Sequence, residues 1–340
     1  MKQLHTDSGA PFFLGEDLFN EMIAFCEKLG SKTVVICEEG VEKIGKKLGL
    51  DLLTFPGGEV SKTREMKALL EDELLTRNVG RDTVIVALGG GVTLDLVGFL
   101  ASTYLRGVPL VLAPTTLLAI VDASLGNKTG VNTPQGKNLI GSFYSPKAIF
   151  ADLNTLQTLP KKEWLNGLAE IWKAGLIADP ALLKEEVHTA IEKAIRVKIK
   201  ILAKDPTEQG MRRILNFGHT IGHAIEKVAE YTIAHGEAVA LGTVVESYLS
   251  YKLGHLSKKE FGIIQKHYET AGFSLELPPN YRRKDLLAAM NLDKKKAGKD
   301  VRFVLIDKIG HAMPFDGAYC TAISSAAKKD MLDWMEAQYG

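Results

Sequence analysis

The chain has 340 residues, of which 46% are hydrophobic and 24% are charged. These proportions are typical of soluble globular proteins and exclude disordered, collagen-like and coiled-coil chains. Lys and Arg number 42 against 41 Asp and Glu, and the net charge of +1 excludes a global field that would draw the chain to nucleic acid or to an anionic membrane. At about 150 residues per domain, the length predicts two domains or one large one.

The three cysteines are Cys26, Cys37 and Cys320, and their spacing matches neither a CxxC motif nor a zinc finger. An odd number of cysteines does not suit a disulfide framework, so we expect a cytoplasmic protein. The N-terminus has no apolar core of a secretory signal, and the most hydrophobic stretch, 97–121, contains Arg106 and two prolines. We therefore expect no membrane segment.

The first half of the chain alternates short β-branched runs with helical patterns. Continuous apolar runs at 33–37, 83–88 and 110–113 are typical of strands that helices cover on both faces. Apolar residues at helical spacing after Thr63 predict a helix between the first two runs, and Gly80 is placed to end it. This alternation predicts an α/β fold with a mostly parallel sheet.

The pattern changes near Pro160. Helical periodicities then follow one another, and strand-like runs nearly vanish until 301–306. The segments 183–194 and 212–229 have the spacing of amphipathic helices. We place the domain boundary here, with an α/β domain over 1–160 and a mainly helical domain over 161–340.

Three glycines, Gly89 to Gly91, follow the strand at 83–88 and open the next helix. Their bare backbone amides could approach a phosphate at the helix N-terminus. A tight strand-to-helix turn explains the glycines equally well, because the run lacks the GxGxxG spacing. Glu38 follows an earlier strand, where a ribose hydroxyl could bind, and the loop 56–59 is a second supporting feature. Taken alone, each reads as an ordinary loop.

The predicted helix 212–229 carries Arg212, Asn216, His219 and His223 at spacings of four, three and four residues. All four share one face of a continuous helix. The neighbouring positions are apolar, and burying such a polar stripe without partners would be costly. The stripe therefore predicts a site, and the His-x-x-x-His spacing is typical of a pair of metal ligands.

Two more residues could complete that site. His235 lies at a predicted helix start, and Glu170 lies on a largely apolar helix with Lys173 one turn further on. Taken alone, His235 reads as a capping residue and Glu170 as half of a surface ion pair. Two histidines and a carboxylate would form a zinc site with one open coordination position, which is typical of catalytic zinc.

The segment 114–141 is rich in small, polar and basic residues. Its composition suits a loop that presents lysines, asparagine and an acid to an anionic ligand. A solvated surface loop is an equally good interpretation.

Several motifs in one order cover almost the whole chain. They are GGGVTLDLVGF, YLRGVPLVLAPTTLLAIVDASLGNKTGVN, GKNLIGSFYSP, DLNTLQTLP, GLAEIWKAG, LNFGHTIGHAIE, HGEAVALG and a late DKK followed by VRFVLIDKIG. In these motifs the chain resembles the 3-dehydroquinate synthase family of sugar-phosphate cyclases. The resemblance implies a Rossmann-like NAD-binding domain over 1–160, a helical metal- and substrate-binding domain over 161–340, and a homodimer.

The resemblance also implies site residues. The Zn²⁺ or Co²⁺ ligands fall on Glu170, His219 and His235. The catalytic positions fall on Asp122, Lys128, Lys173, Lys198, Arg212, Asn216 and His223. Further substrate positions fall on Lys137, Asn138, Lys294 and Arg106, the last reaching the neighbouring subunit's site. The NAD contacts fall on Glu38, Gly58, Glu59, Lys62, Gly91, Val92, Asp95, Thr115, Thr116, Lys128, Lys137 and Thr158.

Three positions depart from the family pattern. Leu94 stands where GGGVxGD has glycine, Asn127 replaces the second glycine of GGKT, and Ala123 replaces a serine. We expect Leu94 to crowd the pyrophosphate loop, which concerns cofactor affinity more than the type of reaction.

The implied reaction converts 3-deoxy-D-arabino-heptulosonate 7-phosphate into 3-dehydroquinate and phosphate. It uses transient oxidation by NAD, elimination of phosphate, re-reduction and an intramolecular aldol closure. The alternatives are a cyclase for another sugar phosphate, a metal-dependent polyol dehydrogenase and a catalytically silent NAD- or zinc-binding regulatory protein.

Overall fold

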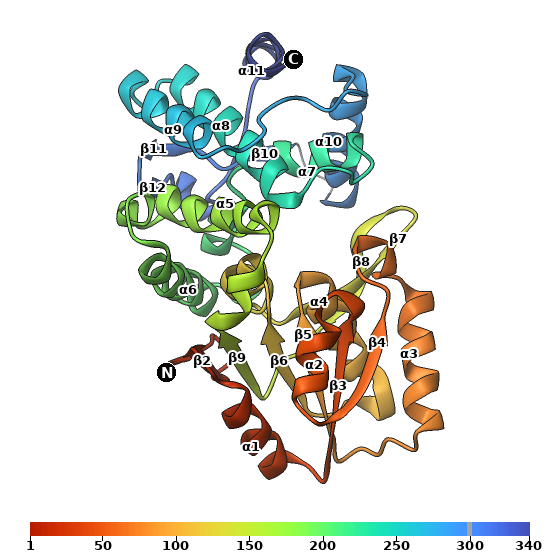
Figure 1. Cartoon of the computed structure of the whole chain (residues 1–340). Coiled ribbons are helices and arrows are strands. Elements are labelled where there is room, and N and C mark those ends of the chain that lie inside the picture. The colour runs from red at the N-terminus through yellow and green to blue at the C-terminus, as the bar shows by residue number, and fades with distance from the viewer. Residues whose placement is uncertain (298–300) are drawn as a thin grey trace. The chain divides into compact units, whose positions relative to one another are not determined.

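The computed structural model describes residues 1–297 and 301–340, with the side chains of 292–297 excepted. The chain divides into two compact units, Met1–Pro160 and Lys161–Gly340 (Figure 1). Among the described residues, no helix combines the length and the apolar character that a membrane crossing requires.

The first unit is built on a seven-stranded sheet with the order β1-β2-β9-β6-β5-β3-β4. Its strands are β1 (Lys2–His5), β2 (Pro11–Gly15), β3 (Lys32–Glu38), β4 (Asp51–Phe55), β5 (Thr83–Gly89), β6 (Leu110–Pro114) and β9 (Ala148–Asp152). All neighbouring pairs are parallel except β1 and β2. The predicted α/β class with a mostly parallel sheet is confirmed.

Helices connect these strands. The α-helices are α1 (Phe19–Leu29), α2 (Glu42–Lys47), α3 (Arg64–Thr76) and α4 (Gly91–Thr103), and the shorter helical turns are η1 (Glu39–Val41), η2 (Glu59–Ser61), η3 (Tyr104–Arg106), η4 (Ala119–Ala123) and η5 (Leu153–Thr158). Thr63 caps α3 by accepting the N–H of Met66. The prediction that Gly80 ends this helix is wrong, because α3 ends at Thr76 and Asn78 takes the left-handed conformation (φ 52°).

The core of the first unit lies on the sheet. Every residue of β5 is buried, which agrees with the continuous apolar run that the sequence shows there. The rings of Phe13 and Phe150 stack at 4.6 Å between centroids. Parallel pairing aligns β3, β5 and β6, and the candidate cofactor residues begin at their carboxyl ends.

The loop predicted over 114–141 is mostly regular structure. The π-helical turn η4 (Ala119–Ala123) is followed by an antiparallel hairpin of β7 (Lys128–Thr133) and β8 (Gly136–Phe143). Gly130 and Gly141 face each other across the hairpin, where the backbones approach too closely for a Cβ atom. Glycines that signal a loop in the sequence therefore serve close strand packing here.

The second unit is mainly helical. It contains α5 (Lys161–Ile177), η6 (Pro180–Leu183), α6 (Val187–Lys204), η7 (Met211–Asn216), α7 (His219–Val228), α8 (His235–Lys252), α9 (Lys258–Thr270), α10 (Arg283–Ala297), η8 (Phe315–Gly317) and α11 (Ser325–Tyr339). Its short strands are β10 (Arg302–Phe303), β11 (Ile306–Lys308), β12 (His311–Ala312) and β13 (Thr321–Ala322). Helix α8 runs through the core, with Tyr248 stacked on Trp334 of α11 at 4.1 Å between ring centroids.

Two predicted helices of this unit have different limits. The segment 212–229 is not one helix, because the 3₁₀ helix η7 ends at Asn216 and Gly218 adopts a φ of 80° before α7 begins at His219. Arg212 and Asn216 therefore do not share a helical face with the two histidines. Likewise α6 begins at Val187, where Glu186 caps it, and Leu183 belongs to η6.

Candidate functional site

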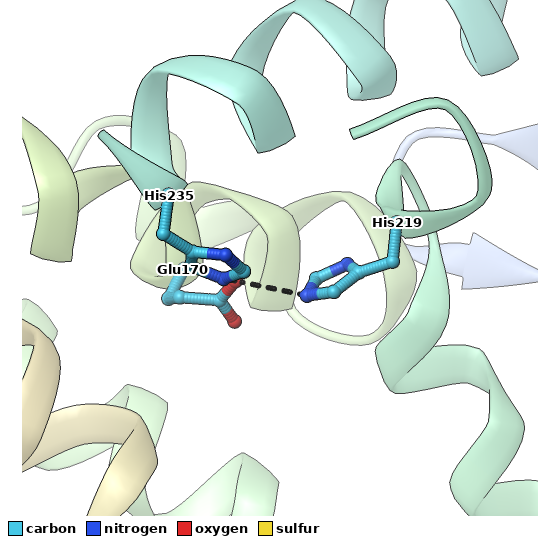
Figure 2. A group of neighbouring side chains, drawn as sticks. All are labelled: Glu170, His219 and His235. Carbon is cyan, nitrogen blue, oxygen red and sulfur yellow. Dashed lines mark ion pairs between the residues drawn. The ribbon is translucent and has the colours of Figure 1, made fainter. Parts of the chain in front are cut away.

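Glu170, His219 and His235 come together in the second unit (Figure 2). Nε2 of His219 lies 3.5 Å from Oε1 of Glu170, and Nε2 of His235 lies 3.7 Å from the same oxygen. Glu170 lies in the middle of α5, whereas each histidine is the first residue of its helix. Three chemically suitable ligand atoms thus surround one point.

Asn166 explains how α5 and α8 meet at this point. It lies one turn before Glu170, and its side-chain oxygen accepts the N–H of Gly236, the residue after His235. A Cβ atom on Gly236 would collide with the backbone of Asn166, so glycine is required for this close approach. The Ala234 N–H is bonded by Glu237 at 3.2 Å, which further fixes the start of α8.

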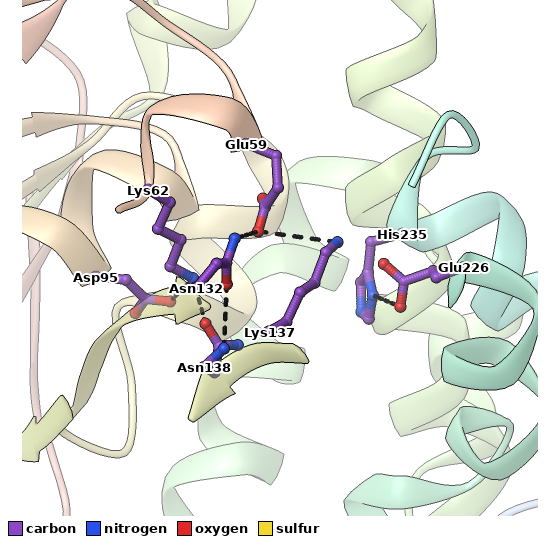
Figure 3. A network of polar contacts seen from close by, with 8 residues as sticks. All are labelled: Glu59, Lys62, Asp95, Asn132, Lys137, Asn138, Glu226 and His235. Atoms are coloured by element: carbon purple, nitrogen blue, oxygen red, sulfur yellow. Dashed lines mark hydrogen bonds and ion pairs between the residues drawn. The ribbon is translucent and has the colours of Figure 1, made fainter. Parts of the chain in front are cut away.

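The Nδ1 atom of each histidine has its own partner. Nδ1 of His219 lies 3.1 Å from the carbonyl oxygen of Phe217, and Nδ1 of His235 lies 3.3 Å from Oε2 of Glu226 (Figure 3). With Nδ1 as the donor, Nε2 keeps its lone pair, and it is Nε2 that faces Glu170. Both rings are thus oriented with Nε2 towards Glu170, as metal ligands at this point would be.

The electrostatics of the cluster are dominated by burial and by Lys173. Burial alone would raise the pKa of Glu170, but the paired Lys173 ammonium and the two histidines hold this pKa well below its usual range. Burial and the charge of Lys173 lower the pKa of His219. Burial would also lower the pKa of His235, but the nearby carboxylates of Glu170 and Glu226 raise it to about 10. Glu170 is therefore an anionic ligand at neutral pH.

These residues fit a divalent cation. Bonds of about 2.0–2.2 Å at tetrahedral angles place two ligand atoms about 3.3–3.5 Å apart, close to the two distances measured here. Oε1 of Glu170 is buried and has no hydrogen-bond partner in the described part of the chain, so this oxygen is left for a ligand. Three protein ligands leave one tetrahedral position open.

His223 does not join this group. Its ring centroid lies 5.1 Å from that of His219, yet the donor group that contains it consists of His223, Glu226 and His235. The structure therefore does not support His219 and His223 as a simple pair of metal ligands. The side chain of His223 is exposed, which leaves it accessible to a substrate.

Arg212 and Asn216 lie on η7, beside residues that sequence reasoning missed. Arg212 is buried, and its guanidinium donates to the carbonyl oxygen of Pro206 at 2.5 Å. Asp205 accepts the Arg212 N–H at 3.0 Å, and Asn216 donates to Glu208 at 2.7 Å. Lys198 lies on α6, and Lys294 lies on α10 with its side chain outside the described part of the structure.

The first unit holds a second polar network (Figure 3). The buried ammonium of Lys62 lies 2.5 Å from Asp95 and 2.6 Å from the side-chain oxygen of Asn138. Asn132 donates to Glu59 at 2.7 Å and accepts the Asn138 N–H at 3.1 Å. Burial raises the pKa of Asp95, while the Lys62 charge opposes that rise. The Lys62–Asp95 salt bridge and these hydrogen bonds thus connect the end of η2, α4 and the β7–β8 hairpin.

A second predicted cofactor residue, Glu38, lies at the end of β3 against the glycine loop. Its carboxylate is 3.4 Å from the N–H of Gly58, and 3.5 Å from both the Gly90 N–H and the Thr93 hydroxyl. Gly91 is the first residue of α4, so the predicted strand-to-helix turn is confirmed. The N-terminus of this helix presents backbone N–H groups beside a carboxylate that could accept from a ribose.

The other predicted residues of the first unit are placed as follows. Val92 lies in the first turn of α4, Thr115 and Thr116 follow β6, Asp122 lies in η4, Lys128 begins β7, Lys137 lies on β8 with its ammonium 3.8 Å from Glu59, Thr158 ends η5 and Arg106 ends η3. Thr116 accepts the Ala119 N–H at 3.1 Å. The Thr115 hydroxyl is buried without a hydrogen-bond partner among the described residues.

The structure shows the surroundings of the three residues that depart from the family pattern. Asn127 adopts a φ of 57°, a conformation that glycine favours and asparagine tolerates better than most residues. A Cβ atom on Gly91 would meet the Ala123 methyl group at 3.4 Å. The side chain of Leu94 is buried, 2% exposed.

Sequence reasoning missed Glu226, Asn166 and Glu208. Glu226 had a usable signal in the sequence, since it is an acidic residue one turn after His223 on a largely apolar helix. The structure shows that it is buried. Asn166 bonds Gly236 and Glu208 bonds Asn216, in each case in a different element of the fold. The periodicity of the sequence does not predict these bonds.

Comparison with known proteins gives consistent matches. The profile of the 3-dehydroquinate synthase N-terminal domain matches residues 52–166, and that of the C-terminal domain matches residues 167–296. A 3-dehydroquinate synthase of Nitrosospira multiformis is 44% identical over 275 residues, which are 76% of this chain and 75% of the relative. That of Methylococcus capsulatus is 39% identical over 341 residues, covering 92% of this chain and 94% of the relative.

Solved structures share the fold. A 2-deoxy-scyllo-inosose synthase complexed with carbaglucose-6-phosphate, NAD⁺ and Co²⁺ has a TM-score of 0.87 at 26% identity, covering 97% of this chain and 98% of that one. The 2-epi-5-epi-valiolone synthase of Streptomyces hygroscopicus, with NAD⁺ and Zn²⁺ bound, has a TM-score of 0.86 at 24% identity, covering 99% and 98%. Because the two family profiles together span most of the sequence and relatives this similar match nearly its whole length, the chain belongs to the 3-dehydroquinate synthase family.

Proposed function

We propose that the chain is an NAD- and divalent-metal-dependent lyase that converts 3-deoxy-D-arabino-heptulosonate 7-phosphate into 3-dehydroquinate and phosphate. Family membership supports the reaction. The observation that carries the metal dependence is the convergence of Glu170, His219 and His235, with a buried carboxylate oxygen left unbonded by the described residues.

Zn²⁺ or Co²⁺ would be held by Glu170 Oε1, His219 Nε2 and His235 Nε2. A donor set of imidazole and carboxylate accepts both ions. When bound, the metal supplies a Lewis acid for the substrate oxygen, and NAD supplies a reversible hydride acceptor, so that no net redox change occurs. The Lys173 ammonium pairs with Oε2 of Glu170, the carboxylate oxygen that does not face the histidines, which keeps the net charge of the cluster low.

NAD would bind at the glycine loop and the Lys62 network. Glu38 would accept from a ribose hydroxyl, and the amides of Gly91 and Val92 at the start of α4 would face the pyrophosphate. The remaining proposed contacts are Gly58, Glu59, Lys62, Asp95, Thr115, Thr116, Lys128, Lys137 and Thr158. The unbonded, buried hydroxyl of Thr115 supports a ligand there.

The substrate carries a carboxylate and a phosphate, and therefore needs cations that can bond both groups. The proposed residues are Lys128, Lys137, Asn138, Lys173, Lys198, Arg212, Asn216 and Lys294. Arg212 is buried, and its guanidinium donates to the Pro206 carbonyl, so it is held in place before the ligand arrives.

Asp122 and His223 would hydrogen-bond the substrate or relay protons. His223 is exposed beside the metal ligands, and Asp122 lies in η4 after the strand that leads to the cofactor residues. An Asp122→Asn variant with unchanged kcat would contradict the first assignment, and a His223→Ala variant with unchanged kcat/KM would contradict the second.

We also propose a cytoplasmic homodimer in which Arg106 reaches the site of the neighbouring subunit. The three cysteines are free and buried, which supports a reducing compartment. Arg106 is exposed at the end of η3, where its side chain is accessible to a second subunit. Sedimentation velocity would test the dimer, and mixing Arg106→Ala with an inactive His219→Ala subunit would test the shared site.

The decisive experiment follows phosphate release and NADH absorbance together, using the heptulosonate phosphate with catalytic NAD and Zn²⁺. We expect stoichiometric phosphate without accumulated NADH. Accumulated NADH would indicate a dehydrogenase instead. Bound NAD with neither signal would indicate a different sugar phosphate or a silent relative.

A further inference from the structure

A single peptide group lies between His219 and a buried carboxyl group. The carbonyl oxygen of the Phe217–Gly218 peptide lies 3.1 Å from Nδ1 of His219, and the N–H of the same peptide donates to Oε2 of Glu246 at 2.9 Å. The C=O and N–H of a trans peptide belong to one rigid plane. We propose that Glu246 is a positioning residue for His219: by fixing this peptide, it holds the imidazole with Nδ1 as donor and Nε2 free for the metal.

The backbone angles explain why the peptide needs fixing. Phe217 (φ −58°, ψ 127°) and Gly218 (φ 80°, ψ −14°) have the angles of the central residues of a type II turn. A type I turn differs mainly by a flip of this central peptide. After the flip, the Phe217 carbonyl would leave Nδ1 of His219 and would face the Glu246 carboxyl oxygen. An ionised Glu246 can only accept, so it bonds the N–H of the type II form and repels the carbonyl oxygen of the flipped form, which selects the form that orients His219.

Glu246 is built for this contact. It lies on α8, is fully buried, and its second oxygen, Oε1, accepts the N–H of Ile221 at 3.3 Å. One side chain thus satisfies the N–H of the turn and an N–H of the first turn of α7, which otherwise lack acceptors. Both oxygens are occupied by backbone, which leaves Glu246 no direct contact with a ligand.

The two metal histidines are then supported in the same way. Glu226 bonds Nδ1 of His235 directly, and Glu246 reaches Nδ1 of His219 through one peptide group. Partners of this kind set ring orientation and ligand basicity, and their loss typically weakens metal binding about 10- to 100-fold. The inference rests on the proposed metal site, and nothing in that proposal assigns Glu246.

The test measures Co²⁺ affinity by competition with a chelator, together with the visible absorption of bound Co²⁺. A Glu246→Gln side chain offers one acceptor and one donor, so it cannot satisfy the N–H groups of both Gly218 and Ile221. We expect about 10-fold weaker binding and an altered absorption spectrum. Ser247→Ala is the matched control. Ser247 is equally buried on α8, but among the described residues its hydroxyl bonds only the Thr243 carbonyl. The Co²⁺ affinity of this variant should stay within about 2-fold of wild type.

A second background separates positioning from a general loss of structure. In His219→Ala protein, Glu246→Gln should weaken residual Co²⁺ binding no further, whereas Glu226→Gln should still weaken it through His235. A purely structural effect of Glu246 would appear in both backgrounds.

The outcomes are distinct. If wild-type protein binds Co²⁺ and Glu246→Gln binds it equally well with the same spectrum, the inference is overturned and the metal site stands. If wild-type protein binds no Co²⁺, the proposed site itself fails. Should Glu246→Gln not fold, Glu246→Asp shortens the same carboxyl by one methylene group, and normal affinity in that variant would overturn the inference.

Discussion

The side-chain oxygen of Asn166 accepts the N–H of Gly236, and this one bond joins the helix of Glu170 to the helix of His235. Asn166→Ala leaves a buried N–H without its partner, which costs about 1–3 kcal/mol of stability. We also expect weaker Co²⁺ binding, because the two ligands are no longer held together. Urea unfolding and chelator competition measure the two effects. Glu163→Gln is the control. The side-chain NH₂ group of Asn166 donates to Glu163 at 3.2 Å, and the amide oxygen of a glutamine at position 163 can still accept that bond.

Glu170 and Lys173 form an ion pair that is buried on both sides, 4% and 3% exposed. Glu170→Gln leaves the Lys173 charge unpaired, which should cost about 3–5 kcal/mol in stability as well as abolish metal binding. The double variant Glu170→Met with Lys173→Met should recover most of the stability and none of the metal binding. Equal unfolding midpoints for the single and double variants would contradict this account.

Gly218 and Gly254 share a φ of 80° but differ in their surroundings. A Cβ atom on Gly254 meets nothing within 4 Å, whereas on Gly218 it collides with the side chain and backbone of Thr243. Gly254→Ala should therefore show backbone strain alone, about 1–2 kcal/mol, and Gly218→Ala should lose clearly more and bind metal less tightly. The comparison fails if the two variants unfold at the same urea concentration.

Burial raises the pKa of the Cys26 thiol to about 12 and that of Cys37 to about 11, from an ordinary value of 9.0. The folded protein keeps these protons at a pH where the unfolded chain loses them. The stabilisation is complete below pH 9 and falls as the pH rises towards 11–12, by up to about 1.4 kcal/mol per pH unit for each thiol. Urea unfolding at pH 8 and at pH 10.5, about midway through that window, measures the fall. Cys37→Ala should show a smaller decline, and an identical decline would argue against the thiols.

Substitutions at Asn127 test whether asparagine costs stability at a position where the family pattern has glycine. Its φ of 57° costs most residues about 1–2 kcal/mol, asparagine less and glycine least. Asn127→Gly should stay within about 0.5 kcal/mol of wild type, whereas Asn127→Ala should lose about 1 kcal/mol. A stable Asn127→Ala protein would mean that the left-handed conformation is not retained there.

Periodicity and residue type were enough to predict the parallel sheet, the helical second half and the helix starts at Gly91 and His235. They were insufficient at 212–229, where the apolar spacing continues straight through the turn at Gly218. A single glycine inside a helical pattern is often tolerated, and the contacts that accompany this break, the bond to Glu246 and the close approach to Thr243, are tertiary.

The same limit applies to the site. His219, His235 and Glu170 could be named from residue type, spacing and family resemblance, but the contacts that support them could not. The bonds from Glu226, Glu246 and Asn166 link elements whose contact depends on how α5, α7 and α8 pack, and spacing along one helix carries no information about that.

Helix α8 has almost no solvent-facing side, since its residues from Gly236 to Ser250 are buried with the exception of Glu237. Tyr248 packs against Phe261 of α9 and stacks on Trp334 of α11. During synthesis, α8 therefore leaves the ribosome well before α11, and the face of α8 that Trp334 covers stays exposed until α11 has emerged. A ribosome-bound chain lacking α11 should therefore hold α8, with the ligand His235 at its head, less firmly and should bind metal more weakly than the full chain.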